Sequence, residues 1–128
     1  MSDRTELERQ LAELPLYQYE FLKTDELTFT ERVRDICRSE CPMYNRSWAC
    51  PPAVGTVEAC RARCMRFDSV LAAATICEVS DIANIDETLA TRAPHEALTH
   101  EIAAMVRQWC GGGTMVLSTE ACAICKTC

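Results

Sequence analysis

The stretch CRSECPMYNRSWACPP, residues 37–52, sets the organisation of the whole sequence. It places three cysteines, one tryptophan, one tyrosine and three prolines within sixteen residues. Proline fixes its own backbone angle and pushes the preceding residue toward extended conformations, so the stretch is neither a regular helix nor a regular strand. A stiff loop also loses less conformational entropy when a bound group orders it. We therefore expect an irregular loop whose backbone is shaped around a metal centre that its cysteines bind.

A helix is predicted on each side of this loop. Residues 31–37 follow the N-cap candidate Thr30, have helical apolar periodicity, and lead Cys37 into the loop. A second helix over residues 57–67 begins at Thr56. Its apolar stripe, at spacing i, i+3, i+7 and i+10, consists of Val57, Cys60, Cys64 and Phe67.

Three segments further from the loop have strand patterns. In residues 16–23, three aromatic residues alternate with polar ones. Residues 69–79 are an almost continuous apolar run, which is typical of a central strand buried on both faces. Residues 114–118 are predicted to be a third, short strand. If the crossovers are right-handed and the strands parallel or mixed, both cysteine-bearing segments meet at one edge of the sheet.

Two more helices are predicted near the ends of the chain. Residues 3–14 have sparse leucine anchors, Leu7, Leu11 and Leu14, and Pro15 ends the pattern. The polar residues 80–94 hold at most a broken helix. A longer helical stripe then ends at the glycine run that begins with Gly111. This stripe consists of Leu98, Ile102, Met105, Val106 and Trp109.

These elements predict an α/β or α+β fold. A chain of 128 residues is long enough for one domain with a real core and too short for two ordinary ones. We expect a single domain over residues 1–128, with an approximately three-stranded sheet, flanking helices and two cysteine-bearing loops.

Charge and hydropathy exclude several classes of protein. The formal net charge is -6 and no cluster of basic residues offsets it, so binding to nucleic acid is not expected. No apolar run approaches about 18 residues, and the N-terminus is charged from the start, so neither a membrane span nor a signal peptide is expected. We expect a cytoplasmic protein. In a reducing compartment its ten cysteines point to metal binding or catalysis rather than to disulfides.

Six of the cysteines fall into two sets with ligand-like spacing. The late set is a C-x2-C-x2-C run, which is the opening of the bacterial ferredoxin pattern of iron-sulfur ligands. It consists of Cys122, Cys125 and Cys128. The early set, in the quoted loop, is Cys37, Cys41 and Cys50. These six residues are the predicted metal and cofactor ligands.

An iron-sulfur cluster is the favoured cofactor, because a C-x2-C-x2-C run suits a cluster better than a tetrahedral ion. Zinc is the alternative, and thiol-disulfide exchange is a third reading that lacks a thioredoxin-like context. The side chains of Met43, Tyr44 and Trp48 are expected to cover the site and limit its contact with water.

The remaining cysteines and the histidines have plainer interpretations. Four cysteines are expected to be buried apolar residues: Cys60, Cys64, Cys77 and Cys110. The i, i+4 spacing of Cys60 and Cys64 leaves a metal-binding pair as the alternative. His95 and His100 are expected to be solvated helix residues, because a separation of five does not place them on one helix face.

The loop and the late cysteines together resemble a known family. Cys-Pro-Met-Tyr (residues 41–44), Trp-Ala-Cys-Pro-Pro (residues 48–52) and the late C-x2-C-x2-C run are similar to motifs of small cysteine-rich predicted metal-binding proteins of unknown function. The resemblance spans about Glu31 to Cys128. It implies metal or iron-sulfur binding through the six motif cysteines, in mainly anaerobic organisms, and it implies no particular reaction.

The expected function is therefore that of an iron-sulfur protein, with a 4Fe-4S cluster, in electron transfer or as an accessory to an anaerobic metalloenzyme. Its expected partner is a redox or metalloenzyme protein, and a homo-oligomer is a further expectation, since a subunit interface can complete a ligand set. The alternative is a zinc-stabilised interaction module without catalysis. The sequence contains no triad or paired-carboxylate arrangement, and it leaves open whether the protein is an enzyme.

Overall fold

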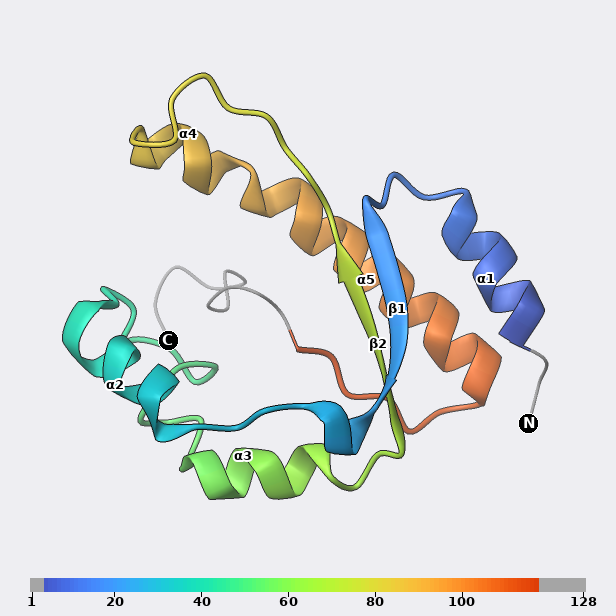
Figure 1. Ribbon diagram of the computed structural model, residues 1–128, viewed down its shortest axis with the longest axis horizontal. Coiled ribbons are helices and arrows are strands. Elements are labelled where there is room, and N and C mark those ends of the chain that lie inside the picture. Colours follow the sequence, from blue (N-terminus) through green and yellow to red (C-terminus); the bar gives the residue numbers. More distant parts are fainter. Residues whose placement is uncertain (1–3, 118–128) are drawn as a thin grey trace. The chain divides into compact units, whose positions relative to one another are not determined.

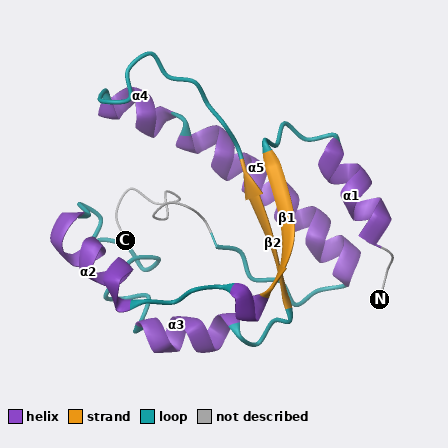
Figure 2. Ribbon diagram, viewed as in Figure 1, coloured by secondary structure: helices purple, strands orange, loops and turns teal. Residues whose placement is uncertain are grey.

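The structure of the protein is a computed structural model, and it describes residues 4–117 (Figure 1). Helices and strands mix along these residues, as Figure 2 shows. In chain order the elements are α1 (Arg4–Ala12), β1 (Gln18–Lys23), the 3-10 turn η1 (Thr24–Glu26), α2 (Glu31–Glu40), α3 (Val57–Cys64), β2 (Ser69–Ala74), α4 (Ile85–Ala90) and α5 (Arg92–Cys110). The protein is a small α+β structure, which is one of the two predicted classes.

The described residues form two compact units. The first contains residues 4–20 and 72–117, with helices α1, α4 and α5. The second contains residues 21–71, with helices α2 and α3. Each strand of the sheet begins in one unit and ends in the other. A single domain over residues 1–128 stays a prediction.

Strands β1 and β2 form a two-stranded antiparallel sheet. The Tyr17 N–H donates to the carbonyl oxygen of Ala74 at 2.9 Å, and the Thr24 N–H donates to that of Asp68 at 3.2 Å. Since the residue numbers rise on one strand as they fall on the other, the pairing is antiparallel. The condition of parallel or mixed strands, under which both cysteine-bearing segments would meet at one sheet edge, is therefore not met by β1 and β2.

Two predictions about the sheet are wrong. In the described part of the chain only two strands occur, and residues 114–117 are not a strand. The three preceding glycines all have positive φ angles, so the chain turns directly before this short segment. The run 69–79 is not buried on both faces either. None of its residues is buried, and the side chains of β2 are either exposed or half-buried.

The core of the first unit lies between α1 and α5, which run beside each other in Figure 1. Leu7 and Leu11 are each 1% exposed, and they are one helical turn apart on α1. From α5, the buried side chains are Leu98, Ile102 and Ala103. Burial of a leucine contributes about 1.5–3 kcal/mol, so these few contacts account for much of this unit's stability. The predicted leucine anchors and the α5 stripe are confirmed at these positions.

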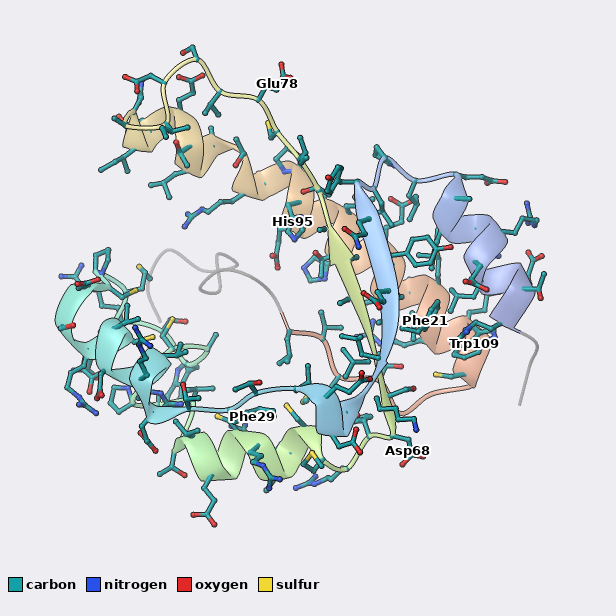
Figure 3. All side chains as sticks on the ribbon, viewed as in Figure 1. Phe21, Phe29, Asp68, Glu78, His95 and Trp109 are labelled. Carbon is teal, nitrogen blue, oxygen red and sulfur yellow. The ribbon has the colours of Figure 1, made fainter. Side chains whose placement is uncertain are left out.

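The carboxyl end of α5 follows the sequence pattern, whereas a residue near its amino end does not. Gly111 is the C-cap, with φ of 79°, and its N–H donates to the carbonyl oxygen of Arg107 at 3.0 Å. Near the other end, Nδ1 of His95 lies 2.8 Å from the Thr75 hydroxyl just after β2 (Figure 3). His95 is half-buried, so its interpretation as a solvated residue is wrong, whereas His100 is exposed.

Candidate metal centre

Helix α2 brings two of the predicted ligands to its carboxyl end. Cys37 lies in the last turn of the helix, and Cys41 is the C-cap, whose N–H donates to the carbonyl oxygen of Cys37 at 3.3 Å. Residues four apart are neighbours on one helix face. Cys37 is half-buried and Cys41 is exposed. At the amino end, Thr30 is the N-cap as predicted, but its side chain makes no capping hydrogen bond.

The loop that follows is irregular, as predicted, and it is ordered by backbone hydrogen bonds. The Tyr44 N–H donates to Cys41 O at 3.2 Å, and the Asn45 N–H donates across the loop to Pro51 O at 2.7 Å. Asn45 has φ of 61°, a left-handed conformation that asparagine tolerates better than most residues. The peptide bond between Pro51 and Pro52 is cis. The loop therefore closes on itself around its third cysteine, Cys50.

The third predicted ligand, Cys50, is placed by a turn around a buried serine. Ser47 is 6% exposed, its carbonyl accepts from the Cys50 N–H at 3.1 Å, and its hydroxyl accepts from the Ala49 N–H at 3.1 Å. The Cys50 carbonyl then accepts from the Val54 N–H at 3.1 Å. Helix α3 begins directly afterwards, because the Thr56 side chain accepts from the backbone N–H of its third residue.

Two arginines hold the end of this loop, and the sequence analysis missed both of them. Arg34 on α2 donates to the carbonyl oxygen of Gly55 at 2.5 Å, and Arg63 on α3 donates to that of Val54 at 2.5 Å. The sulfur of Cys60 lies 3.8 Å from the Arg34 guanidinium and 3.2 Å from that of Arg63. The three side chains therefore join α2, the loop and α3 within the second unit. In the sequence, the one signal for this role is that Arg34 precedes Cys37 by about one helical turn.

The predicted cover of the site is only partly present. Trp48 is 75% exposed, so it does not cover the loop within the described residues. Met43 and Tyr44 are half-buried. The hydrogen bond with Tyr44 is the largest cause that raises the pKa of the Arg38 guanidinium on α2 above its ordinary value, followed by the charge of Asp35. Tyr44 is therefore half-buried next to α2, whereas Trp48 is exposed.

The early cysteines are the part of the predicted ligand set that the structure places. Cys37, Cys41 and Cys50 are free thiols on one ordered segment. Cys122, Cys125 and Cys128 lie outside the described residues. Between residues 4 and 117, no group of three or more His, Cys, Asp or Glu side chains is close enough to hold a metal ion. The six-cysteine ligand set stays a prediction, although the thiol donors present are those that zinc and iron-sulfur clusters take.

The other four cysteines divide into two pairs. Cys64 is buried, as predicted, and Cys60 is half-buried on the same helix. Cys77 and Cys110 are exposed, so their prediction as core residues is wrong. Cys77 follows the point where β2 ends, and Cys110 is the last residue of α5. A hydrogen bond between the Cys110 sulfur and the Thr114 hydroxyl, 3.4 Å apart, is the largest cause that lowers the pKa of the Cys110 thiol.

Among the described helices, none combines the length and the apolar character that a bilayer span requires.

Comparison with known proteins gives one result for nearly the whole chain. No curated protein and no solved structure matches the sequence. The model of a family described as predicted metal-binding proteins (DUF2284) matches residues 20–128. Because this match covers more than half of the sequence, and because it includes the cysteine loop and the late cysteines, the chain belongs to this family of predicted metal-binding proteins.

Proposed function

We propose that this protein holds a 4Fe-4S cluster and acts in electron transfer, or as an accessory to an anaerobic metalloenzyme. The proposed ligands come from the two cysteine sets, Cys37, Cys41 and Cys50 with Cys122, Cys125 and Cys128. The observation that carries the proposal is the ordered early loop, which presents three free thiols in a member of a metal-binding family.

The composition of the second unit supports a bound metal. Among its described residues, the buried side chains are Thr24, Ser47 and Cys64, of which two are polar and none is large. The first unit, by contrast, buries leucine and isoleucine between two helices. Small units without an apolar core need a metal or another crosslink, and metal binding supplies that folding free energy directly. Thiolate ligation in the loop would supply stability that the buried side chains of the second unit do not provide.

The exposure of the loop supports a role toward a protein partner. Cys41 is exposed, Trp48 is 75% exposed, and Val33 on α2 is 62% exposed. A bound cluster would supply one-electron chemistry, and exposure and nearby hydrogen bonds would tune its potential. The proposed partner is a redox or metalloenzyme protein in the cytoplasm of an anaerobic organism, with direct electron exchange across the contact.

The proposal is tested by the iron, sulfide and zinc content of protein purified without oxygen. We expect about four irons and four sulfides for each cluster, with an electron paramagnetic resonance signal after reduction. The Cys50→Ala variant should lose most of the iron. The Cys77→Ala variant is the matched control, because that thiol is exposed and outside both motifs.

Stoichiometric zinc without sulfide would contradict the electron-transfer proposal. Equal iron loss in both variants would contradict the assignment of Cys50 as a ligand. Zinc would instead favour an interaction module that the metal stabilises, which is the alternative that the sequence left open.

A further inference from the structure

The segment between β2 and α5 in the first unit exposes several large apolar side chains to solvent. The exposed fractions are 64% for Ile76, 85% for Ile82, 68% for Ile85 and 44% for Leu89. Single exposed apolar residues are normal on proteins, but several within one short segment are typical of an interaction surface. We name residues 76–89 the isoleucine segment.

Hydrogen bonds hold the middle of the isoleucine segment in one conformation. The Ala83 N–H donates to the Asp81 carboxylate at 2.9 Å, and the Asn84 N–H donates to the Asp81 carbonyl at 3.0 Å. The Glu87 carboxylate accepts from the Ser80 N–H at 2.6 Å and from its hydroxyl at 2.7 Å. Ile82 and Ile85 are thus displayed by an ordered turn, so a partner would bind them at a low entropic cost.

The charge of this segment is one-sided. It contains four carboxylates, those of Glu78, Asp81, Asp86 and Glu87, and neither lysine nor arginine occurs between Arg66 and Arg92. An exposed segment that is both apolar and acidic fits a partner surface that is both apolar and basic.

The end of α3 in the second unit has that complementary character. Arg61, Arg63 and Arg66 are exposed, and Met65 among them is 39% exposed. Arg63 already donates to the Val54 carbonyl and to Cys60, so Arg61 and Arg66 are the charges available for a partner. We name Arg61, Met65 and Arg66 the arginine surface.

We propose that a second copy of this chain docks its arginine surface onto the isoleucine segment. Met65 would pack against Ile82 and Ile85, and Arg61 and Arg66 would face the Glu78 and Asp86 carboxylates. If the same contact is made reciprocally, two copies form a closed dimer. The proposed contact uses none of the six predicted ligand cysteines, so it differs from an interface that completes a ligand set.

Sedimentation equilibrium of the full chain tests the proposal at about 50 mM and about 500 mM NaCl. We expect a dimer that the higher salt weakens, because charge pairs at a rim are screened. The Ile82→Asp/Ile85→Asp variant should dimerise at least about tenfold more weakly. Tyr17→Asp is its matched control, because Tyr17 is an exposed apolar residue of the same unit, 65% exposed, outside the segment.

Charge reversal separates this contact from any other dimer. The variants Glu78→Arg/Asp86→Arg and Arg61→Glu/Arg66→Glu should each be monomeric alone, because each presents like charges to its own kind. Mixed together they should form heterodimers, since both contacts regain opposite charges. The Arg32→Glu variant is the control, and far-UV circular dichroism confirms folding. A monomeric wild type, a dimer that none of these changes affects, or a mixture that stays monomeric would overturn the proposal.

Discussion

Arg34 and Arg63 are the residues on which the geometry of the cysteine loop depends most directly. Each guanidinium donates to a loop carbonyl, and the bond from Arg34 is partly buried. A hydrogen bond to a charged group contributes about 1.5–3 kcal/mol, and a carbonyl left without its donor adds a desolvation penalty. We therefore expect Arg34→Met to lower the free energy of unfolding by about 2 kcal/mol and to speed metal loss to a chelator.

The exposed Arg32, on the same helix, provides the control for that substitution. Arg32→Met should leave both the chemical denaturation midpoint and the rate of metal loss unchanged. If the two methionine variants behaved alike, the contact with Gly55 would have no positioning role.

The Glu87 carboxylate is expected to make the stability of the turn at Ser80 depend on pH. Its pKa is lowered from the ordinary value of 4.5, first by the hydrogen bond from the Ser80 backbone N–H and then by that from the Ser80 hydroxyl. A lowered pKa stabilises the folded turn above the unfolded value, and this stabilisation is lost as the pH falls through the folded pKa. Exchange of the Ser80 amide hydrogen should therefore gain an acid-dependent component below about pH 4.5. That component should be absent in Glu87→Gln, and its presence there would assign the effect to another group.

At the scale of elements, the main helices and the positions of β1 and β2 could be predicted from the sequence, whereas the number of strands and their pairing could not. The α5 stripe repeats every 3.6 residues and ends at Gly111, and these are local signals that need no distant partner. The burial of β2 and the absence of a strand at residues 114–117 depend on how many strands pair, which is decided by distant parts of the chain. The run 69–79 was apolar enough for a central strand, but within residues 4–117 only β1 pairs with it.

The packing of α1 on α5 leads to a prediction about one element. Leu11 is 1% exposed, and its replacement by alanine leaves a cavity as well as losing transfer free energy. We expect Leu11→Ala to lower the free energy of unfolding by about 2–5 kcal/mol, measured by chemical denaturation. Leu14, two residues after α1, is only half-buried, so Leu14→Ala should cost clearly less. Equal costs would mean that α1 is not anchored through Leu11.

At the scale of the whole molecule, the sequence indicated where the candidate site lies but not what holds it in place. Local motifs located the loop and the helix before it, but α2 continues to Glu40, so Cys37 lies in the helix and the C-cap at Cys41 was not predicted. The contact of Arg34 with Gly55 joins residues 21 positions apart, and no local pattern encodes such a distance. The exposure of Trp48 was missed for the same reason. Whether a tryptophan beside a cysteine motif is buried depends on which distant residues pack against it, and the motif does not specify them.

The contrast between the two units predicts how the molecule responds to metal removal. The first unit has an apolar core between α1 and α5, whereas the described residues buried in the second are Thr24, Ser47 and Cys64. If thiolate ligation orders the second unit, a chelator should remove its source of stability and leave the first unit largely intact. Hydrogen exchange should then accelerate in α2 and α3 by at least about tenfold, with little change in α1 and α5. The Cys50→Ala protein should show that pattern without a chelator, and uniform exchange in both units would mean that the metal does not stabilise the loop.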